Sequence, residues 1–275
     1  MKVVNRDKEF TLATTRRFGS PIDQIANAFL IPLRSARILP NPNHISRVEL
    51  RDSEDSSNQL AVDLELFRTN ALLLMRFVHL VNAGHEVKVI ADLDKLEKLL
   101  LSLFELANGR PPMLRSIARF KDLGDLVDYL TIQNSRRRKN KYSSAPDWVP
   151  DVNVLLKMVI PYKDGSFELV NADLLRLEAW EKLLLAIEKA KVNSGSAKIT
   201  LATAHRAKGL TADTVWVHPE FQLDSIYSGA RSISQATEFV ENYSATLTES
   251  EAEVFREGIR LCYVAVTRAR NLLIH

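Results

Sequence analysis

The stretch that decides the fold is residues 199–217, which read ITLATAHRAKGLTADTVWV. Its two ends, 199–202 and 214–217, are short runs rich in β-branched and apolar residues, a composition typical of strands. Between them lies a polar segment with Gly209, a residue that permits close backbone approach. Two strands joined by such a segment favour a parallel α/β sheet that presents ligand-binding groups at its edge. The donors in this segment that suit phosphate groups are Thr203, His205 and Lys208.

A second stretch, residues 254–274, predicts a buried helix followed directly by a strand. Apolar residues and one glycine recur at helical spacing and predict one buried stripe; they are Val254, Phe255, Gly258, Ile259, Cys262, Tyr263 and Val266. The stripe ends at Thr267, and the apolar run 272–274 follows. An arginine at this junction, Arg268, has a fixed position and is available to a ligand. The alternative is a solvated arginine at a helix C-terminus, where cations are mildly favoured.

Together, residues 203–210 (TAHRAKGL) and 263–270 (YVAVTRAR) resemble motifs V and VI of superfamily 1 DNA helicases of the UvrD/Rep type. The resemblance implies an α/β fold, namely the second RecA-like domain of such a helicase. This domain has a parallel sheet flanked by helices, no P-loop of its own, and an inserted, mostly helical subdomain. We therefore expect residues 1–92 to form the first part of the RecA-like 2A domain, 93–192 a helical insertion like the 2B subdomain, and 193–275 the second part of the 2A domain.

Residues 16–30 match the place of motif IV in that family. The sequence predicts a helix over 22–30, and Pro21 can occupy its first turn. The family has an arginine before this helix, which Arg17 matches. The residue before that arginine is often aromatic in the family and stacks on the adenine, whereas this chain has Arg16, whose guanidinium can also stack on a base. A basic entry to a helix is the alternative interpretation.

Residues 61–90 read as a strand, a helix and a strand, with Gly84 closing the helix. The unit resembles the motif IVa region, which implies that Arg68 and Asn70 lie against the DNA strand. The alternative is that Thr69 or Asn70 caps the helix, and the two roles are compatible.

Residues 93–191 read as helices, at 93–107, 120–130, 152–160 and 174–191. The segment 120–129 resembles the F-box DNA helicase branch of the family. The most basic run of the chain, 136–142, reads RRRKNKY. It is either a solvated loop or a segment that neutralises phosphates and makes binding salt-dependent.

The composition limits the cellular setting and the partners. A single cysteine, Cys262, excludes an internal disulfide, so we expect a reducing intracellular compartment, cytoplasmic or nuclear. No apolar run approaches the length of a membrane span and the N-terminus has no signal-peptide pattern, so we expect no membrane partner. The formal net charge of +3 permits nucleic-acid binding without arguing for it.

The motifs that bind ATP phosphates are missing from this sequence. No glycine opens a P-loop, and no Asp-Glu pair follows an apolar strand. The resemblance therefore implies that ATP with Mg²⁺ is bound mainly by an N-terminal RecA-like domain, in cis or in trans, and that this chain alone is inactive.

The resemblance also assigns roles to single residues. The catalytic arginines that meet the γ-phosphate are Arg17 and Arg268. The residues that grip single-stranded DNA are Arg68, Asn70, Thr203 and His205. The residues on the nucleotide side are Arg16, Lys208, Gly209 and Thr211, the last standing where the family usually has a glutamate that holds the ribose. We expect this chain to be the C-terminal half of an ATP-dependent 3′ to 5′ DNA helicase. The alternative is a non-catalytic module that binds nucleic acid or protein.

Overall fold

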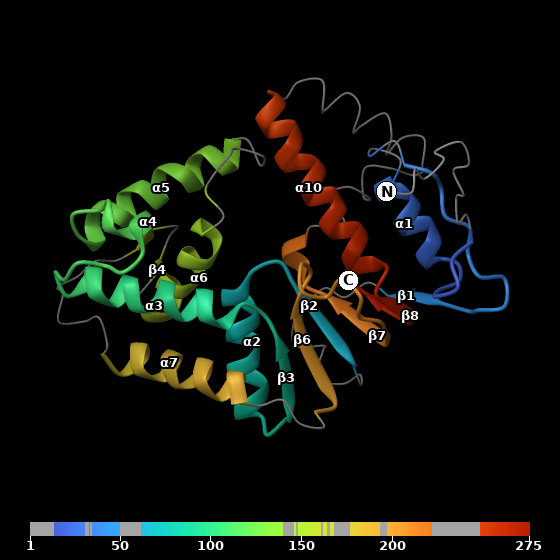
Figure 1. Cartoon of the computed structure of the whole chain (residues 1–275), viewed down its shortest axis with the longest axis horizontal. Coiled ribbons are helices and arrows are strands. Elements are labelled where there is room, and N and C mark those ends of the chain that lie inside the picture. The colour runs from blue at the N-terminus through green and yellow to red at the C-terminus, as the bar shows by residue number, and fades with distance from the viewer. Residues whose placement is uncertain are drawn as a thin grey trace, which may run out of the picture.

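The computed structural model describes residues 14–30, 33, 35–49, 62–139, 146, 148–160, 162–163, 166–167, 177–192, 197–221 and 248–275. At its centre is a six-stranded sheet in the order β1-β8-β7-β2-β6-β3, in which every neighbouring pair is parallel (Figure 1). The strands are β1 (Arg47–Glu49), β2 (Leu64–Phe67), β3 (Val87–Ile90), β6 (Ile199–Thr203), β7 (Ala212–Val217) and β8 (Ala269–Ile274). The predicted parallel α/β fold is confirmed.

Both faces of the sheet are covered by helices. On one face lie α1 (Ile22–Leu30) and α10 (Glu249–Val266), and on the other lies α2 (Asn70–Asn82). Side chains alternate between the faces of a strand, so Leu64 and Leu66 of β2 join the core under α1 and α10, while Phe67 joins the core under α2. The central strand is therefore buried on both sides.

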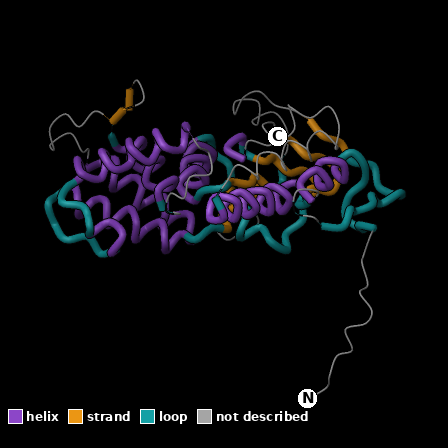
Figure 2. Tube along the Cα trace, turned by 90° about the horizontal axis from the view of Figure 1, so that it is seen from above, coloured by secondary structure: helices purple, strands orange, loops and turns teal. Residues whose placement is uncertain are grey.

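The helices of residues 93–192 pack beside the β3 edge of the sheet and fill one end of the molecule (Figures 1 and 2). They are α3 (Leu93–Ala107), α4 (Arg115–Ala118), α5 (Leu123–Lys139), α6 (Val149–Val159) and α7 (Leu177–Val192). Their buried side chains form one continuous hydrophobic cluster with α2 and one face of the sheet. The division of the chain at residues 93 and 192 stays a prediction.

Several elements differ from the sequence-based expectation. The short hairpin of β4 (Tyr162–Lys163) and β5 (Ser166–Phe167) was not predicted. Helix α5 continues to Lys139, into the basic run, while residues 140–142 and the side chains of 136–139 lie outside the described residues. Residues 1–13 and 222–247 also lie outside them. None of the described helices combines the length and the apolar character needed to cross a membrane.

A buried ion pair joins the central strand to α2. Glu65 accepts hydrogen bonds from Nε and Nη2 of Arg76 at 2.8 and 3.0 Å, and the two residues are only 1% and 8% exposed. The guanidinium also lies 5.6 Å from the ring of Trp216 on β7. Two-point contact satisfies both charges, which is the condition for holding an ion pair in a core.

We predict that Glu65→Ala lowers the free energy of unfolding by about 3–5 kcal/mol, because it leaves the Arg76 guanidinium buried without its carboxylate. Denaturant titration followed by circular dichroism measures the change. The control is Glu86→Ala, at an exposed position next to β3, which should shift stability by about 0.5 kcal/mol or less. Equal losses in the two variants would contradict the prediction.

Candidate functional site

Arg268 lies where α10 gives way to β8 and is only 8% exposed. Its Nε donates to the Val264 carbonyl at 2.8 Å, Nη1 to the Leu210 carbonyl at 3.1 Å, and Nη2 to Thr267 Oγ1 at 3.0 Å. The contact with Val264 satisfies a carbonyl in the last turn of α10, but Arg268 is buried and is not the solvated arginine of the alternative interpretation. The same contacts fix the guanidinium in one orientation.

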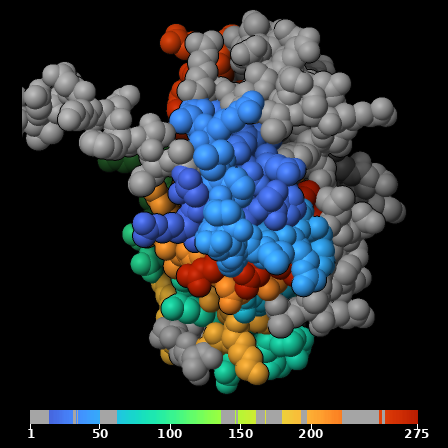
Figure 3. Space-filling model, turned by 90° about the vertical axis from the view of Figure 1, so that its right-hand side faces the viewer, coloured from blue at the N-terminus to red at the C-terminus, as the bar shows by residue number. Residues whose placement is uncertain are grey.

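Arg17 lies against the residue before Arg268. Its Nη1 donates to the Thr267 carbonyl at 3.2 Å, and its side chain is half-buried. The backbone nitrogen of Arg17 in turn donates to Thr15 Oγ1 at 3.1 Å. Figure 3 shows the surface of the described residues between 14 and 49, in blue, lying against a red surface from the C-terminal end of the chain. Two arginines far apart in the sequence are therefore brought together, and we call them the arginine pair.

The arginine pair is a concentration of positive charge. Burial, and secondly the charge of Arg17, lower the pKa of Arg268. Burial raises the pKa of the neighbouring Tyr263, and the charges of Arg268 and Arg17 oppose that rise. Within the part of the chain that the structure describes, neither arginine forms an ion pair with a carboxylate. Like charges held side by side without an acid are a natural binding place for an anion.

Three of the predicted DNA-contacting residues meet at the carboxyl edge of the sheet. Arg68 follows β2, and Thr203 and His205 lie at the end of β6. The strands are neighbours, because Phe67 pairs with Thr203 and accepts a hydrogen bond from the Ala204 nitrogen at 2.9 Å. Arg68 and His205 are exposed, whereas Thr203 is 5% exposed.

The fourth predicted DNA contact, Asn70, has partners inside the protein. Its Nδ2 donates to Asp151 Oδ2 at 3.4 Å, and its Oδ1 accepts from the Asp92 nitrogen at 3.2 Å. Asn70 thus ties the start of α2 to α6 and to the residue before α3. Thr69 is the N-cap, because its hydroxyl accepts from the Leu72 nitrogen at 3.3 Å, so the capping interpretation is confirmed for Thr69.

Two carboxylates that sequence reasoning missed hold the N-terminus of α2. Glu220, in the short helix η3 (Pro219–Phe221), accepts from the backbone nitrogens of Arg68 and Thr69, the latter at 3.2 Å. Asp151 Oδ1 accepts from the Ala71 nitrogen at 2.9 Å. Burial raises the pKa of Asp151 and raises that of Glu220 to about 7. No local pattern indicates these contacts, because both acids come from distant parts of the chain.

Residues 204–211, which we call the crossing segment, connect the two ends of the sheet. The segment leaves the carboxyl end of β6 and reaches the amino end of β7, where the Ala212 nitrogen donates to the Arg268 carbonyl at 3.1 Å. Gly209 has a φ of 96°, a conformation that favours glycine. Lys208 is exposed and Thr211 is half-buried. The crossing segment therefore begins at the carboxyl edge of the sheet, beside the predicted DNA-contacting residues, and ends at the arginine pair.

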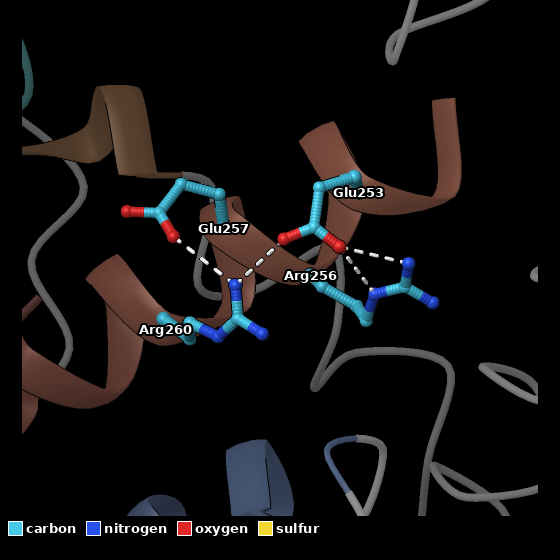
Figure 4. Close-up of polar contacts among 4 residues, drawn as sticks. All are labelled: Glu253, Arg256, Glu257 and Arg260. Atoms are coloured by element: carbon cyan, nitrogen blue, oxygen red, sulfur yellow. Dashed lines mark hydrogen bonds and ion pairs between the residues drawn. The ribbon is translucent and has the colours of Figure 1, made fainter. Parts of the chain in front are cut away.

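Two further charged features of the described residues, Arg16 and the charged face of α10, give no additional site. Arg16 is exposed, and its carbonyl accepts from Asn41 Nδ2 at 3.3 Å. Figure 4 shows a ladder of ion pairs on α10, formed by the exposed side chains of Glu253, Arg256, Glu257 and Arg260. This ladder is a solvated, charge-balanced helix face. Among the described residues, no group of three or more His, Cys, Asp or Glu side chains is placed to hold a metal ion.

The raised pKa of Glu220 predicts a pH dependence of stability. Because this pKa is about 7 in the folded protein, above its ordinary value of 4.5, the contribution of Glu220 is complete below pH 4.5 and is lost as pH rises through about 7. Glu220→Gln removes this titration. The melting temperature of the variant relative to wild type should therefore rise between pH 5 and pH 8. A constant difference for Glu220→Gln would contradict the prediction.

Comparison with known proteins agrees with the motifs and the fold. Residues 76–275 match the family described as the UvrD-like helicase C-terminal domain. The chain is 26% identical to the F-box DNA helicase protein 1 of Schizosaccharomyces pombe, over 97% of this chain and 27% of that protein, so it spans about a quarter of the length of this curated relative. The family match covers most of the chain and includes motifs V and VI, and the chain therefore belongs to the UvrD-like helicase C-terminal domain family.

Proposed function

We propose that this chain is the second RecA-like half of an ATP-dependent DNA helicase, and that Arg17 and Arg268 act on a nucleotide held by another RecA-like domain. The observation that carries the proposal is the arginine pair. Two guanidinium groups lie beside Thr267 with no carboxylate paired to either of them in the described chain. A phosphate group brings the missing negative charge and offers oxygens to the N–H groups of both arginines.

The residues of this chain fit one side of a nucleotide site and not the whole of it. The arginine pair suits phosphate oxygens, whereas the sequence has no P-loop and the described residues offer no carboxylate cluster for Mg²⁺. ATP with Mg²⁺ supplies the phosphoryl group whose hydrolysis drives the helicase. Arg17 and Arg268 would neutralise the charge that develops on that group, a contribution of about 10³ to 10⁵ in rate for such arginines.

The nucleoside side of the site is the part that departs from the family. Arg16 is exposed and replaces the aromatic residue expected to stack on the adenine. Thr211 replaces the glutamate expected at the ribose. We infer that the arginine pair keeps its role toward the phosphates, while the base is held by the flat face of a guanidinium or by the partner domain.

Single-stranded DNA is the second ligand of the proposal. Arg68, Thr203 and His205 lie at the carboxyl ends of two neighbouring strands; Arg68 and His205 are exposed donors that suit the phosphates of a DNA strand, whereas Thr203 is buried. The DNA contact of Asn70 stays a prediction, and its amide also holds α2 to Asp151 and Asp92. Asn70 would also act on DNA by orienting Arg68, two residues earlier.

Coupling between the ligands would pass through the crossing segment. The Leu210 carbonyl accepts from Arg268, while the other end of the segment follows Thr203. Movement of the arginine pair on nucleotide hydrolysis would therefore shift the backbone that leads to the DNA edge. Repeated closure and opening against the first RecA-like domain would carry the chain along one strand, 3′ to 5′ as the family resemblance implies.

The arginine pair is tested in a protein in which this chain is joined to a P-loop-bearing RecA-like domain. We predict that Arg17→Ala and Arg268→Ala each lower kcat for DNA-stimulated ATP hydrolysis by about 10³-fold or more. The matched control is Arg270→Ala, whose side chain is 53% exposed and lies 4.0 Å from Asp213. Its kcat should stay within about twofold of wild type. Unchanged turnover in Arg268→Ala would refute the assignment.

The DNA edge is tested on this chain by fluorescence anisotropy with labelled oligodeoxythymidylate. We predict that Arg68→Ala weakens binding and reduces the slope of log affinity against log salt by about 0.7, the value for one phosphate contact with a single strand. The control is Arg256→Ala, which removes an exposed arginine from the ion-pair ladder on α10. If the slope of log affinity against log salt falls equally in both variants, DNA binding depends on overall positive charge and not on a defined contact at Arg68.

The alternative function is a non-catalytic module that binds nucleic acid or protein. Two observations favour it, namely the departures at Arg16 and Thr211 and the internal partners of Asn70. Salt-dependent DNA binding by the chain, with no ATP hydrolysis after a P-loop-bearing domain is joined to it, would establish this alternative.

A further inference from the structure

A single buried hydroxyl connects the two chain segments that carry the arginine pair. Ser46, just before β1, is 5% exposed. Its Oγ accepts a hydrogen bond from the Gly19 backbone nitrogen at 2.9 Å and donates one to the Arg270 carbonyl at 2.6 Å. Gly19 lies two residues after Arg17, and Arg270 lies two residues after Arg268. The serine hydroxyl, with one donor and two lone pairs, makes both contacts at once.

The backbone around Gly19 leaves little freedom at this junction. A Cβ placed on Gly19 would lie 1.8 Å from the His44 carbonyl oxygen, so the two backbones are in direct contact. The Asn41 nitrogen also donates to the Phe18 carbonyl at 3.0 Å. The segment that carries Arg17 is therefore fixed against residues 41–46, and these residues are fixed to β8 by Ser46.

We propose that Ser46 is a positioning residue, which holds Arg17 and Arg268 at the spacing that a phosphate group requires. The proposal rests on the function proposed above for the arginine pair and adds a residue that touches neither the nucleotide nor either guanidinium. The direct contact between the arginines' own segments is the bond from Arg17 to the Thr267 carbonyl. Without Ser46, the two segments would still be held by that bond and by the pairing of β1 with β8, but Gly19 and Arg270 would lose the hydroxyl that joins them.

The chain supplies a matched control for Ser46. His44 Nε2 also contacts the Arg270 carbonyl, at 3.1 Å, whereas His44 meets Gly19 through its backbone carbonyl. Ser46→Ala breaks the link between the two segments, whereas His44→Ala removes one exposed contact to β8 and leaves the link intact. A difference in triphosphate affinity or turnover between these variants therefore measures the effect of the Ser46 link between Gly19 and Arg270, and not the effect of a lost contact to β8.

The first test uses this chain with inorganic triphosphate as the probe. Arginine side-chain Nε–Hε signals are followed by NMR during the titration. In Ser46→Ala we expect the triphosphate dissociation constant to rise about fivefold or more and the backbone amide of Gly19 to exchange faster with solvent. Both quantities should stay within about twofold of wild type in His44→Ala. Equal effects of the two substitutions on triphosphate affinity would overturn the proposal.

The second test measures turnover in the protein joined to a P-loop-bearing domain. We expect Ser46→Ala to lower kcat by about 10- to 100-fold, the scale of a small misplacement of a catalytic group, with KM for ATP and DNA affinity within about twofold of wild type. When Ser46→Ala is combined with Arg17→Ala, kcat should fall little below that of Arg17→Ala alone, because Ser46 acts through Arg17. A full additional loss in the double variant would refute the positioning role.

Two results separate this proposal from the one on which it rests. If Arg17→Ala and Arg268→Ala bind triphosphate and turn over ATP as wild type does, the proposed function fails, and the role of Ser46 fails with it. If both arginine variants are impaired while Ser46→Ala behaves as His44→Ala, only the positioning role fails. Should Ser46→Ala not fold, the comparison uses Ser46→Thr and Ser46→Val, which have nearly the same shape and differ in the hydroxyl. Equal turnover in that pair overturns the proposal.

Discussion

The architecture depends on one topological constraint. Strands β6 and β7 are parallel and lie on opposite sides of β2, so residues 204–211 must return along the length of the sheet before β7 can begin. This return runs over the face covered by α1 and α10, where Ala204 and Ala207 are buried. Its end meets Arg268 through the Leu210 carbonyl. A short connection without a helix therefore joins the carboxyl end of β6 directly to the amino end of β7, beside Arg268.

The buried charged side chains of this protein form two different arrangements. Glu65 and Arg76 neutralise each other inside the core, where Nε and Nη2 of the guanidinium bond to the two carboxylate oxygens. Arg17 and Arg268 instead lie side by side and bond only to carbonyl and hydroxyl oxygens. The first arrangement is complete by itself and stabilises the fold. The second lacks a negative charge among the described residues, and for this reason we propose that it binds a phosphate group.

Local patterns located most elements of the fold correctly. The helices at 22–30 and 93–107 and the strand at 87–90 have the predicted bounds, because their apolar residues recur at a clear helical or strand spacing. Helix α4 and the β4–β5 hairpin were missed because they are too short to establish a period. The family resemblance pointed to Arg17 and Arg268, whose catalytic role stays a prediction, and only the folded chain brings Arg17 to the Thr267 carbonyl.

By itself, the sequence determined the parallel α/β fold, the family and the residues that carry motif resemblance, since these depend on local periodicity and on short runs of residues. Tertiary structure alone decided which side chains meet. It gave Asn70 its partners Asp151 and Asp92, placed Glu220 at the start of α2, and set Ser46 between Gly19 and Arg270. The physical reason is that each of these contacts joins residues distant along the chain, so no local pattern contains it.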